Sequence, residues 1–182
     1  AVQRVRKGLV RTFQVTRLFS DMTPEEHVTL TVLQREKKAT RILGRFVGNA
    51  DVADEVEGIL GTLGLLDVAR RKVGEIAYGQ QRLLEIAIAL ALKPKVLLLD
   101  EPAAGVPSTD TRRIEQALDR LPPSLAVLMI EHDMDLVFRF AKRVVVLAAG
   151  EIIFEGQPSE VAANPKVREA YLGNYANARS VA

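Results

Sequence analysis

The sequence predicts an α/β fold with a parallel sheet, and two apolar runs and one helix carry this prediction. Val96–Leu99 and Leu125–Ile130 are short and apolar, as expected of strands buried on both faces. Arg82–Leu92 has the length and composition of a buried helix. The first strand leads into Asp100 and the second toward His132, so the sheet should bring both side chains to its carboxyl edge, where open α/β sheets bind ligands.

The composition is that of an ordinary globular domain, alone or with a subdomain. Of the 182 residues, 48% are apolar and 26% are charged, and a net charge of +2 suggests neither nucleic acid nor an anionic membrane surface as a partner. The chain has no cysteine, which excludes disulfides and fits a cytosolic compartment. No apolar run approaches the ~20 residues that a membrane-spanning helix needs.

The N-terminal part should contain a short strand and then a helix. Residues 1–14 are basic and then apolar, which indicates an extended segment that ends at Gln14. Thr23 can cap a helix, Pro24 suits its first position, and acidic residues follow in its first turn. The helical pattern then continues as far as Phe46.

A second helix is expected over Asp51–Leu63, where apolar residues recur at helical spacing and Gly64 provides a stop. The charge run 35–38 should form a solvated face, and His27 should be exposed.

Residues 77–81 read Ala-Tyr-Gly-Gln-Gln and precede the helix of residues 82–92. A glycine before a helix lets backbone N–H groups and the positive end of the helix dipole face an anion. Most such glycines are ordinary turns, so this signal alone is weak. The segment 93–95, which contains Pro94, ends the helix.

Asp100 and Glu101 directly follow the first buried strand, and their chemistry suits a magnesium-dependent nucleotide hydrolase. The aspartate would support the metal, and the glutamate would orient and activate a water molecule. The alternative is that both are solvated acids at a strand end, which the flanking apolar pattern favours less.

The C-terminal part should alternate helices and strands. An amphipathic helix is expected over Thr109–Leu121 and a short helix over Asp135–Phe140. Arg143–Leu147 and Glu151–Phe154 should pair as a hairpin because Ala-Ala-Gly joins them. After the hairpin, residues 156–160 should turn into a helix that Asn164-Pro165 breaks, and a last helix should end near Tyr171.

Five motifs follow one another along the chain. They are Arg-Thr-Phe-Gln at 11–14, Ala-Tyr-Gly-Gln-Gln at 77–81, Leu-Leu-Leu-Asp-Glu-Pro at 97–102, Glu-His-Asp-Met-Asp-Leu-Val at 131–137 and Asn-Pro-Lys-Val-Arg-Glu-Ala-Tyr-Leu-Gly at 164–173. In this order they resemble the ATP-binding subunits of ABC transporters. The details resemble most the subunits that serve importers of branched-chain amino acids, amides or urea.

The resemblance implies a P-loop NTPase (RecA-like) core with an inserted helical subdomain. Residues 1–16 would be a remnant of the core with the glutamine loop, residues 17–76 the helical subdomain, and residues 77–182 the remainder of the core. It implies ATP and Mg²⁺ as cofactors, because this family hydrolyses magnesium-bound ATP.

The resemblance also implies roles for four residues at the nucleotide. Gln14 would touch the magnesium ion or the attacking water, and Asp100 would support the metal. Glu101 would be the general base. His132 would contact the γ-phosphate and hold the attacking water; its imidazole can be neutral or charged near neutral pH.

A second group of residues would act across a dimer. Ala77, Tyr78, Gly79 and Gln80 correspond to the signature loop, which in the family contacts the γ-phosphate held by the opposite subunit. Ala77 replaces the serine of most ABC proteins, so the Gly79 N–H and the Gln80 side chain would make that contact. Pro107 replaces an Asp or Asn in the loop that crosses the dimer interface.

The phosphate-binding loop of such ATPases, Gly-x-x-x-x-Gly-Lys-Ser/Thr, is absent, because the sequence contains no Gly-Lys dipeptide. In the family this loop precedes the glutamine at position 14, and the chain begins with Ala1 rather than methionine. We therefore expect an N-terminally truncated fragment that binds ATP weakly and does not turn it over. Its missing strands should leave an exposed sheet edge, which favours self-association.

The partners implied by the resemblance are transmembrane permease subunits, a second ATPase subunit that is identical or related and, indirectly, a periplasmic solute-binding protein. The protein would lie on the cytoplasmic face of the membrane and would not bind nucleic acid. Two alternatives stay open. One is a non-catalytic interaction or regulatory module derived from an ABC ATPase, which Ala77 and Pro107 favour slightly but the retained Gln14, Asp100, Glu101 and His132 oppose. The other is a soluble ABC ATPase of DNA repair or translation, which the near-neutral charge and the importer-like tail oppose.

Overall fold

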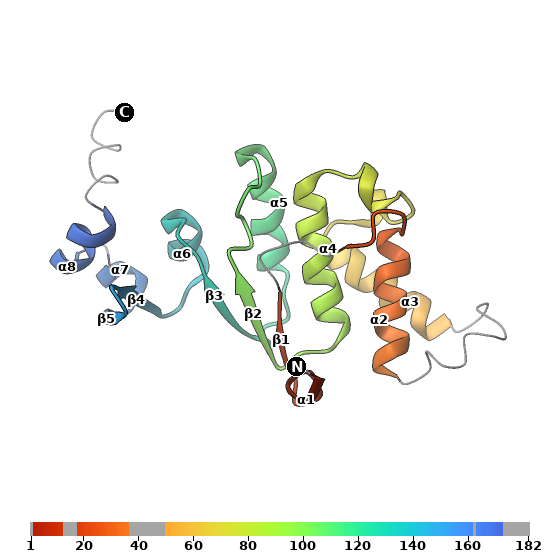
Figure 1. Ribbon diagram of the computed structural model, residues 1–182, viewed down its shortest axis with the longest axis horizontal. Coiled ribbons are helices and arrows are strands. Elements are labelled where there is room, and N and C mark those ends of the chain that lie inside the picture. Colours follow the sequence, from red (N-terminus) through yellow and green to blue (C-terminus); the bar gives the residue numbers. More distant parts are fainter. Residues whose placement is uncertain (1, 13–17, 37–49, 162, 173–182) are drawn as a thin grey trace. The chain divides into compact units, whose positions relative to one another are not determined.

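The computed structural model describes residues 2–12, 18–36, 50–161 and 163–172 (Figure 1). Their contacts divide the chain into two compact units, one that ends at Ile130 and one that begins at Glu131. Gln14 and the predicted helical pattern around Phe46 lie outside the described residues.

The first unit is built on a parallel three-stranded sheet with the order β1-β2-β3. Its strands are β1 (Leu9–Arg11), β2 (Val96–Asp100) and β3 (Ala126–Ile130). The predicted adjacency of the second and third strands is therefore confirmed. A short helix, α1 (Val2–Arg6), precedes β1 where the sequence predicted an extended segment.

Gly8 makes the turn from α1 into β1. Its φ is +86°, and a Cβ at this position would lie 2.9 Å from Cγ of Lys95. The Gly8 carbonyl accepts hydrogen bonds from the N–H groups of Lys95 and Val96 at 2.8 and 3.0 Å. Glycine therefore allows β1 to start directly beside the first residue of β2.

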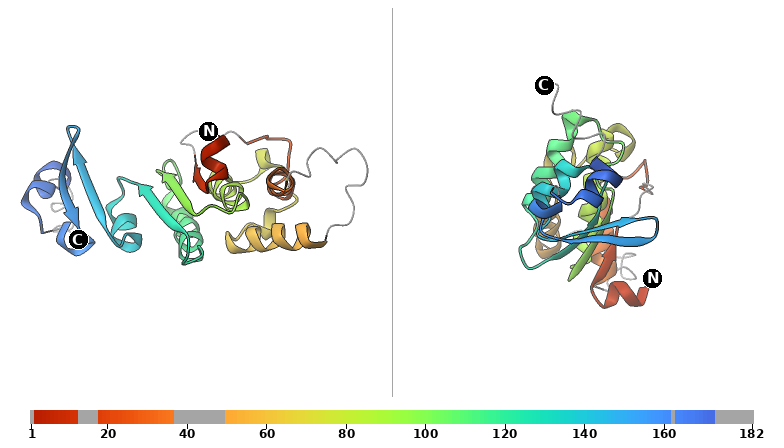
Figure 2. Two further views of the ribbon diagram at one scale, coloured as in Figure 1. Left: turned by 90° about the horizontal axis from the view of Figure 1, so that it is seen from below. Right: turned by 90° about the vertical axis from the view of Figure 1, so that its left-hand side faces the viewer.

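The prediction that both strands are buried on both faces is wrong. In β2 the burial alternates, with Leu97 and Leu99 buried and their neighbours half-buried. In β3 the side chains of Leu128 and Ile130 are each 60% exposed. Figures 1 and 2 show α4 (Tyr78–Ala91) and α5 (Ser108–Asp119) beside the sheet, where they can cover one face only.

Three helices pack together next to the sheet: α2 (Pro24–Arg35), α3 (Ala50–Thr62) and α4. The segment between α3 and α4 contains two short 3₁₀ turns, Leu66–Val68 and Val73–Glu75. The predicted stop at Gly64 is confirmed, since its φ of +65° ends the helical conformation. The buried core of this part consists of Val28, Val32, Val56, Leu60, Leu63, Leu65, Leu83, Leu84 and Ile86.

The predicted start of α2 is confirmed by a complete capping box. Thr23 Oγ1 accepts the backbone N–H of Glu26 at 3.2 Å, and the Glu26 carboxylate accepts the N–H of Thr23 at 2.8 Å. Pro24 occupies the first helical position, where no N–H is needed. Both bonds satisfy donors that would otherwise lack a partner within the helix.

Replacement of Thr23 by alanine should cost about 1 kcal/mol of unfolding free energy, because it removes one of these two bonds. Urea denaturation followed by circular dichroism measures the change. Thr62→Ala is a matched control, since Thr62 bonds only the Gly58 carbonyl inside its own helix. A loss at Thr23 no larger than that at Thr62 would show that the cap does not stabilise α2.

His27 is buried, which corrects the prediction that it is exposed. Two hydrogen bonds hold its side chain. One joins Nδ1 to the Thr23 carbonyl oxygen at 2.9 Å, and the other joins Nε2 to the Phe19 N–H at 3.1 Å. Because Nε2 accepts a hydrogen bond, the proton of the neutral ring lies on Nδ1 and is donated to the carbonyl. The Phe19 ring stacks on the imidazole, with ring centroids 5.9 Å apart.

Arg35 is also buried in part, which corrects the prediction of a solvated face at the end of α2. Its guanidinium donates to both carboxylate oxygens of Glu55 in α3, at 2.7 and 2.9 Å, and to the Ala91 carbonyl of α4 at 2.6 Å. The hydrogen bond from Arg35 holds the pKa of Glu55 below its ordinary value, although burial acts in the opposite direction. Lys93 lies 3.2 Å from the same carboxylate. One cluster of charges therefore joins three helices.

The second unit contains a hairpin with helical segments, as predicted. Strands β4 (Val144–Ala148) and β5 (Glu151–Gly156) pair antiparallel, with a register shift between Val146 and Leu147. The helices are α6 (Met134–Phe140), α7 (Pro158–Val161) and α8 (Pro165–Val167), followed by a π-helical turn over Arg168–Leu172. Its buried core is formed by Val144, Val146, Val161 and Val167.

Candidate functional site

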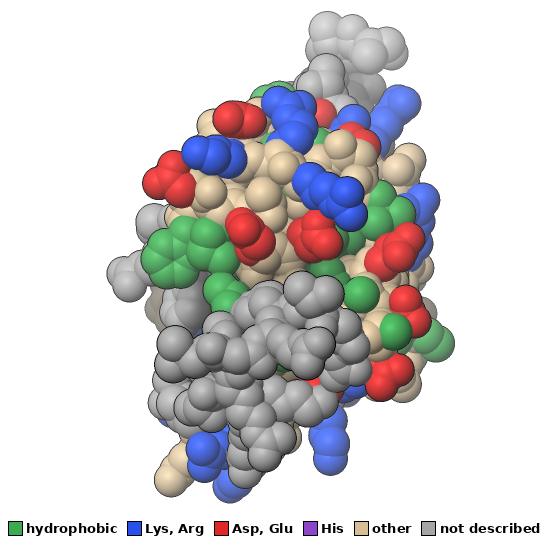
Figure 3. All heavy atoms as spheres, turned by 90° about the vertical axis from the view of Figure 1, so that its right-hand side faces the viewer, with side chains coloured by type: hydrophobic (Ala, Val, Ile, Leu, Met, Phe, Trp, Pro, Cys, Tyr) green, Lys and Arg blue, Asp and Glu red, His purple; other side chains and the backbone are tan. Residues whose placement is uncertain are grey.

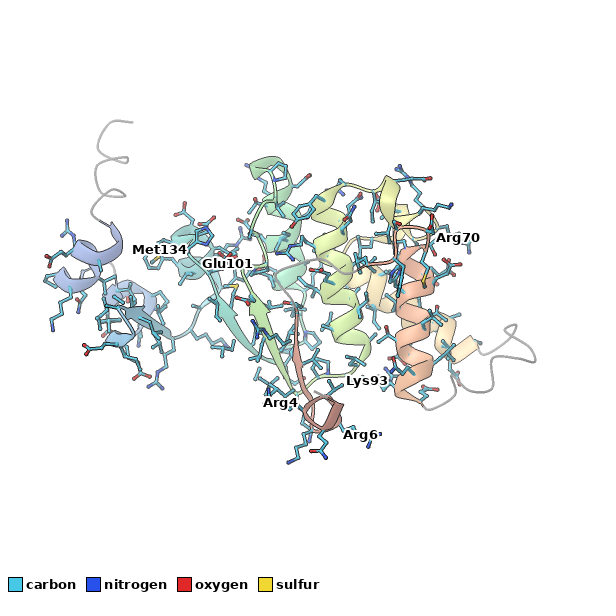
Figure 4. The ribbon with its side chains drawn as sticks, in the orientation of Figure 1. Arg4, Arg6, Arg70, Lys93, Glu101 and Met134 are labelled. Atoms are coloured by element: carbon cyan, nitrogen blue, oxygen red, sulfur yellow. The ribbon has the colours of Figure 1, made fainter. Side chains whose placement is uncertain are left out.

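The carboxyl edge of the β1-β2-β3 sheet carries two of the predicted residues. Asp100 is the last residue of β2 and Glu101 follows it. Figure 4 shows Glu101 at the end of the sheet opposite to Arg4 and Arg6. The Glu101 N–H donates to the Ile130 carbonyl at 2.9 Å, so the pairing of β2 with β3 extends one residue beyond the strand.

Glu101 has an unusual backbone conformation. Its φ is +46°, in the left-handed region that side-chain-bearing residues rarely adopt and that costs of the order of 1 kcal/mol. Such strain persists only where surrounding contacts hold it. The Glu101 N–H donates to the Ile130 carbonyl, and the Glu101 carbonyl accepts hydrogen bonds from Arg82 Nη2 at 3.3 Å and from the Ala104 N–H at 3.0 Å.

Arg82 connects α4 to this backbone and was missed by the sequence analysis. Its side chain is 3% exposed, pairs with Glu85 at 2.9 Å and lies over the Tyr78 ring, 5.8 Å from its centroid. The available signal was a pair of opposite charges, Arg82 and Glu85, three residues apart at the start of the apolar part of the helix. The arrangement links the first turn of α4 to the residue expected to be the general base.

The predicted signature segment begins α4 rather than preceding it, so the helix starts four residues earlier than predicted. Ala77 is the N-cap, and Gln80 Oε1 accepts its N–H at 3.1 Å. Alanine offers no acceptor in return, so only half of a capping box forms. The Gln80 side chain is 9% exposed and is therefore engaged within the turn.

Gly79 and Tyr78 pack against the loop that follows Glu101. A Cβ at Gly79 would lie 3.2 Å from Cβ of Asp110 and 3.4 Å from Cγ1 of Val106. A Cβ at Gly105, whose φ is +72°, would lie 3.4 Å from the Tyr78 ring. The start of α4 and this loop are thus in close contact, and residue 79 has little room for a side chain.

The Asp100 carboxylate is paired with Arg11 of the neighbouring strand, with 2.6 Å between Arg11 Nη2 and Asp100 Oδ2. Within the described ranges, no three His, Cys, Asp or Glu side chains are grouped to hold a metal ion. Magnesium in nucleotide sites takes one or two carboxylates and is otherwise bound by phosphates and water. A single carboxylate at Asp100 therefore fits a supporting ligand for nucleotide-bound magnesium, and it does not fit a metal site made of protein alone.

His132 lies in the second unit, close to the start of α6. The Glu131 carboxylate is 1% exposed and accepts the N–H groups of His132 and Asp133 at 3.1 and 3.4 Å. Asp133 in turn caps α6 by accepting the N–H groups of Asp135 and Leu136. These bonds fix the backbone at His132, whose side chain is 72% exposed.

The structure thus brings Asp100, Glu101 and the signature segment together in the first unit. His132 belongs to the second unit. Gln14 lies outside the described residues. None of the helices that the structure describes is long and apolar enough to cross a bilayer.

Known proteins match the chain along most of its length. The ABC transporter family matches residues 1–104, and the branched-chain amino acid ATP-binding cassette transporter family matches residues 151–177. The high-affinity branched-chain amino acid transport ATP-binding protein BraF of Pseudomonas aeruginosa is 39% identical over 176 residues, which are 92% of this chain and 69% of BraF. LivG of Escherichia coli, described in the same words, is 36% identical over 180 residues, 94% of this chain and 70% of LivG.

Solved structures of ATP-binding cassettes also match the chain over most of its length. An ATP-binding cassette of an ABC transporter, MJ1267, superposes with a TM-score of 0.75 at 29% identity, over 93% of this chain and 70% of that one. Its ADP conformation gives a TM-score of 0.73, also at 29% identity. The chain therefore spans about 70% of the length of the cassettes that it resembles.

Proposed function

Because the chain belongs to the ATP-binding subunits of ABC transporters, and to those of branched-chain amino acid importers, we propose that it couples ATP hydrolysis to the import of branched-chain amino acids or related solutes. The observation that carries the catalytic part is the backbone of Glu101, which Ile130 and Arg82 hold in a left-handed conformation at the carboxyl edge of the sheet.

We propose that Glu101 is the general base that takes the proton of the attacking water. Asp100 would support Mg²⁺, which supplies charge neutralisation at the phosphates when ATP is bound. His132 would contact the γ-phosphate, and its exposed ring on a fixed backbone suits that role. Gln14 would complete the site near the metal or the water.

The signature segment would act on the nucleotide of a second ATPase subunit. The first turn of α4, a helix of 14 residues, presents N–H groups to an anion at its positive end. The buried Gln80 side chain bonds Ala77, which supports a contact made by backbone N–H groups, including that of Gly79, rather than by this side chain. Ala77 and Tyr78 would border the phosphate.

The proposed domain arrangement assigns residues 1–16 to the core, 17–76 to the helical subdomain and 77–182 to the remaining core. The helical subdomain would dock on the permease at the cytoplasmic face of the membrane. Its described residues expose the large hydrophobic side chains Phe19, Leu30 and Leu66. Figure 3 shows hydrophobic side chains among mixed charges on one face of the molecule, a pattern that suits a protein interface.

The experiment that tests this function uses the full encoded polypeptide that contains these residues. It is co-expressed with permease and ATPase subunits of a branched-chain amino acid importer, and ATP hydrolysis of the purified assembly is measured with and without solute-loaded binding protein. We expect co-purification and a rate that leucine, isoleucine or valine stimulates. An assembly that forms without any such stimulation would contradict the proposed solute class, and failure to co-purify would contradict the transporter role.

The 182 residues by themselves contain no Gly-Lys phosphate-binding loop, so we expect the isolated chain not to turn over ATP. Phosphate release with Mg-ATP in excess measures this. A rate above that of the Glu101→Gln variant would show that the described residues hydrolyse ATP without that loop.

A further inference from the structure

The ion pair between Arg11 and Asp100 lies on one face of the sheet. In the parallel register Arg11 is opposite Leu98, and Asp100 follows Leu98 by two residues, so all three side chains point to the same face. The Thr12 N–H donates to the Leu98 carbonyl at 3.0 Å, which fixes the end of β1 beside β2. The backbone therefore places the guanidinium at the carboxylate.

The two partners differ in their exposure to water. The Asp100 side chain is 17% exposed, whereas the Arg11 side chain is 56% exposed. A carboxylate with so little access to water needs a compensating charge. Among the described residues, Arg11 is the only cationic side chain that contacts Asp100. Arg11 is thus the partner whose side chain has access to the solvent.

A guanidinium and a divalent cation are alternative partners for the same carboxylate oxygen, because both are hard, positively charged ligands of an anionic acceptor. We propose that Arg11 is a resident counter-cation of Asp100, which neutralises this carboxylate when no metal is bound and competes with a divalent cation for it. The inference rests on the proposed function, which assigns Asp100 to magnesium. Arg11 thus sets how tightly the site holds its metal.

The test uses Mn²⁺ in the presence of excess ATP as the probe and this chain as the protein, because Asp100 fits a supporting ligand for a nucleotide-bound metal. Amide NMR signals of Leu99 and Ile130, which flank Asp100 on β2 and β3, are followed as Mn²⁺ is added, and the concentration that broadens them by half is recorded. Arg11→Met should lower that concentration about five-fold, because it removes a competing charge that belongs to one partly exposed ion pair. Arg11→Lys, which keeps the charge, should stay near the wild-type value.

Arg143→Met is the matched control. Arg143 pairs with Glu155 in the β4–β5 hairpin at the same distance of 2.6 Å, and its side chain is exposed like that of Arg11. This variant loses one charge and one ion pair that does not involve Asp100, so Mn²⁺ broadening at Leu99 should be unchanged. The dispersed NMR spectrum of each variant reports at the same time whether it is folded.

The outcomes separate this inference from the proposed function. Suppose that Asp100→Asn abolishes the broadening and Arg11→Met does not lower the Mn²⁺ concentration that gives half-broadening. Asp100 then binds the cation but Arg11 does not compete for it, so the inference is overturned while the function stands. If Asp100→Asn leaves the broadening unchanged, the assignment of Asp100 to the metal is wrong and both are overturned. If Arg11→Met and Arg143→Met lower the half-broadening Mn²⁺ concentration equally, the effect is one of net charge, and the inference about Arg11 is overturned.

Discussion

Replacement of Glu101 by glutamine is expected to lower the ATP hydrolysis rate of the assembled transporter by about 10³-fold, because an amide cannot accept the proton of the attacking water. Glutamine keeps the size of the side chain. The backbone bonds to Ile130 and Arg82 do not involve the carboxylate, so the fold should be retained. The assay is phosphate release by the purified assembly at saturating Mg-ATP.

Glu151→Gln provides the control for charge, since Glu151 is an exposed residue at the start of β5. It should leave the hydrolysis rate within two-fold of the wild type, as expected of a surface substitution, which usually shifts free energies by about 0.5 kcal/mol or less. Nucleotide binding by the Glu101→Gln assembly should be preserved. A variant that hydrolyses ATP at the wild-type rate would remove Glu101 from the role of general base.

The Glu55→Gln substitution is expected to destabilise the protein by about 2 kcal/mol at pH 7, because it leaves the half-buried Arg35 without its bidentate partner. The charge cluster holds α2, α3 and α4 together, so the loss should appear in the global unfolding transition. Urea denaturation measures it. Glu57→Gln, an exposed position two residues further along α3, is the matched control and should change little.

The same pair predicts a dependence of stability on pH. The pKa of Glu55 is lowered in the folded state from an ordinary value of 4.5, first by its hydrogen bond with Arg35. Below pH 4.5 the unfolded chain therefore binds more protons at this residue than the folded chain, so the contribution is present above that pH and is lost as the pH falls through the folded pKa. Glu55→Gln should therefore reduce the fall in stability that accompanies acidification below pH 4.5. An unchanged slope would mean that the pair does not couple protonation to folding.

The parts of the fold that the sequence predicted are those whose signals are local. Thr23 and Glu26 are three residues apart and form the capping box that their spacing indicated. Arg35 reads as a surface residue because its partner Glu55 lies 20 residues away on another helix. His27 was likewise misjudged, because Phe19 and the Thr23 carbonyl enclose it only once the chain turns back on itself.

The burial of the strands shows a second reason why prediction from the sequence is incomplete. Apolar composition predicts that a residue prefers to be covered, but it does not say whether a covering element is present. Leu97 and Leu99 face helices and are buried, whereas Leu128 and Ile130 have the same composition and are mostly exposed. The predicted self-association involves an exposed sheet edge and apolar surface, and these two side chains add to that apolar surface.

For the candidate site, Asp100 and Glu101 could be found because they stand together behind an apolar run. Arg82 could not be assigned in the same way. Its bond to the Glu101 carbonyl joins residues 19 positions apart, and only the packing of α4 on the strand end reveals it. The left-handed backbone at Glu101 also leaves no trace in the sequence, since glycine rather than glutamate is the residue typical of that conformation.

The position of β1 at one side of the sheet has a consequence for how the chain assembles during synthesis. Thr12, directly after β1, bonds Leu98, a residue 86 positions later, so the pairing of β1 with β2 cannot form until β2 has left the ribosome. Contacts between such distant residues form slowly, because a long loop must close first. Meanwhile α2, α3 and α4 emerge in succession and can pack on one another. We therefore expect the helices to form a compact nucleus early, and β1 to dock as one of the last steps of folding.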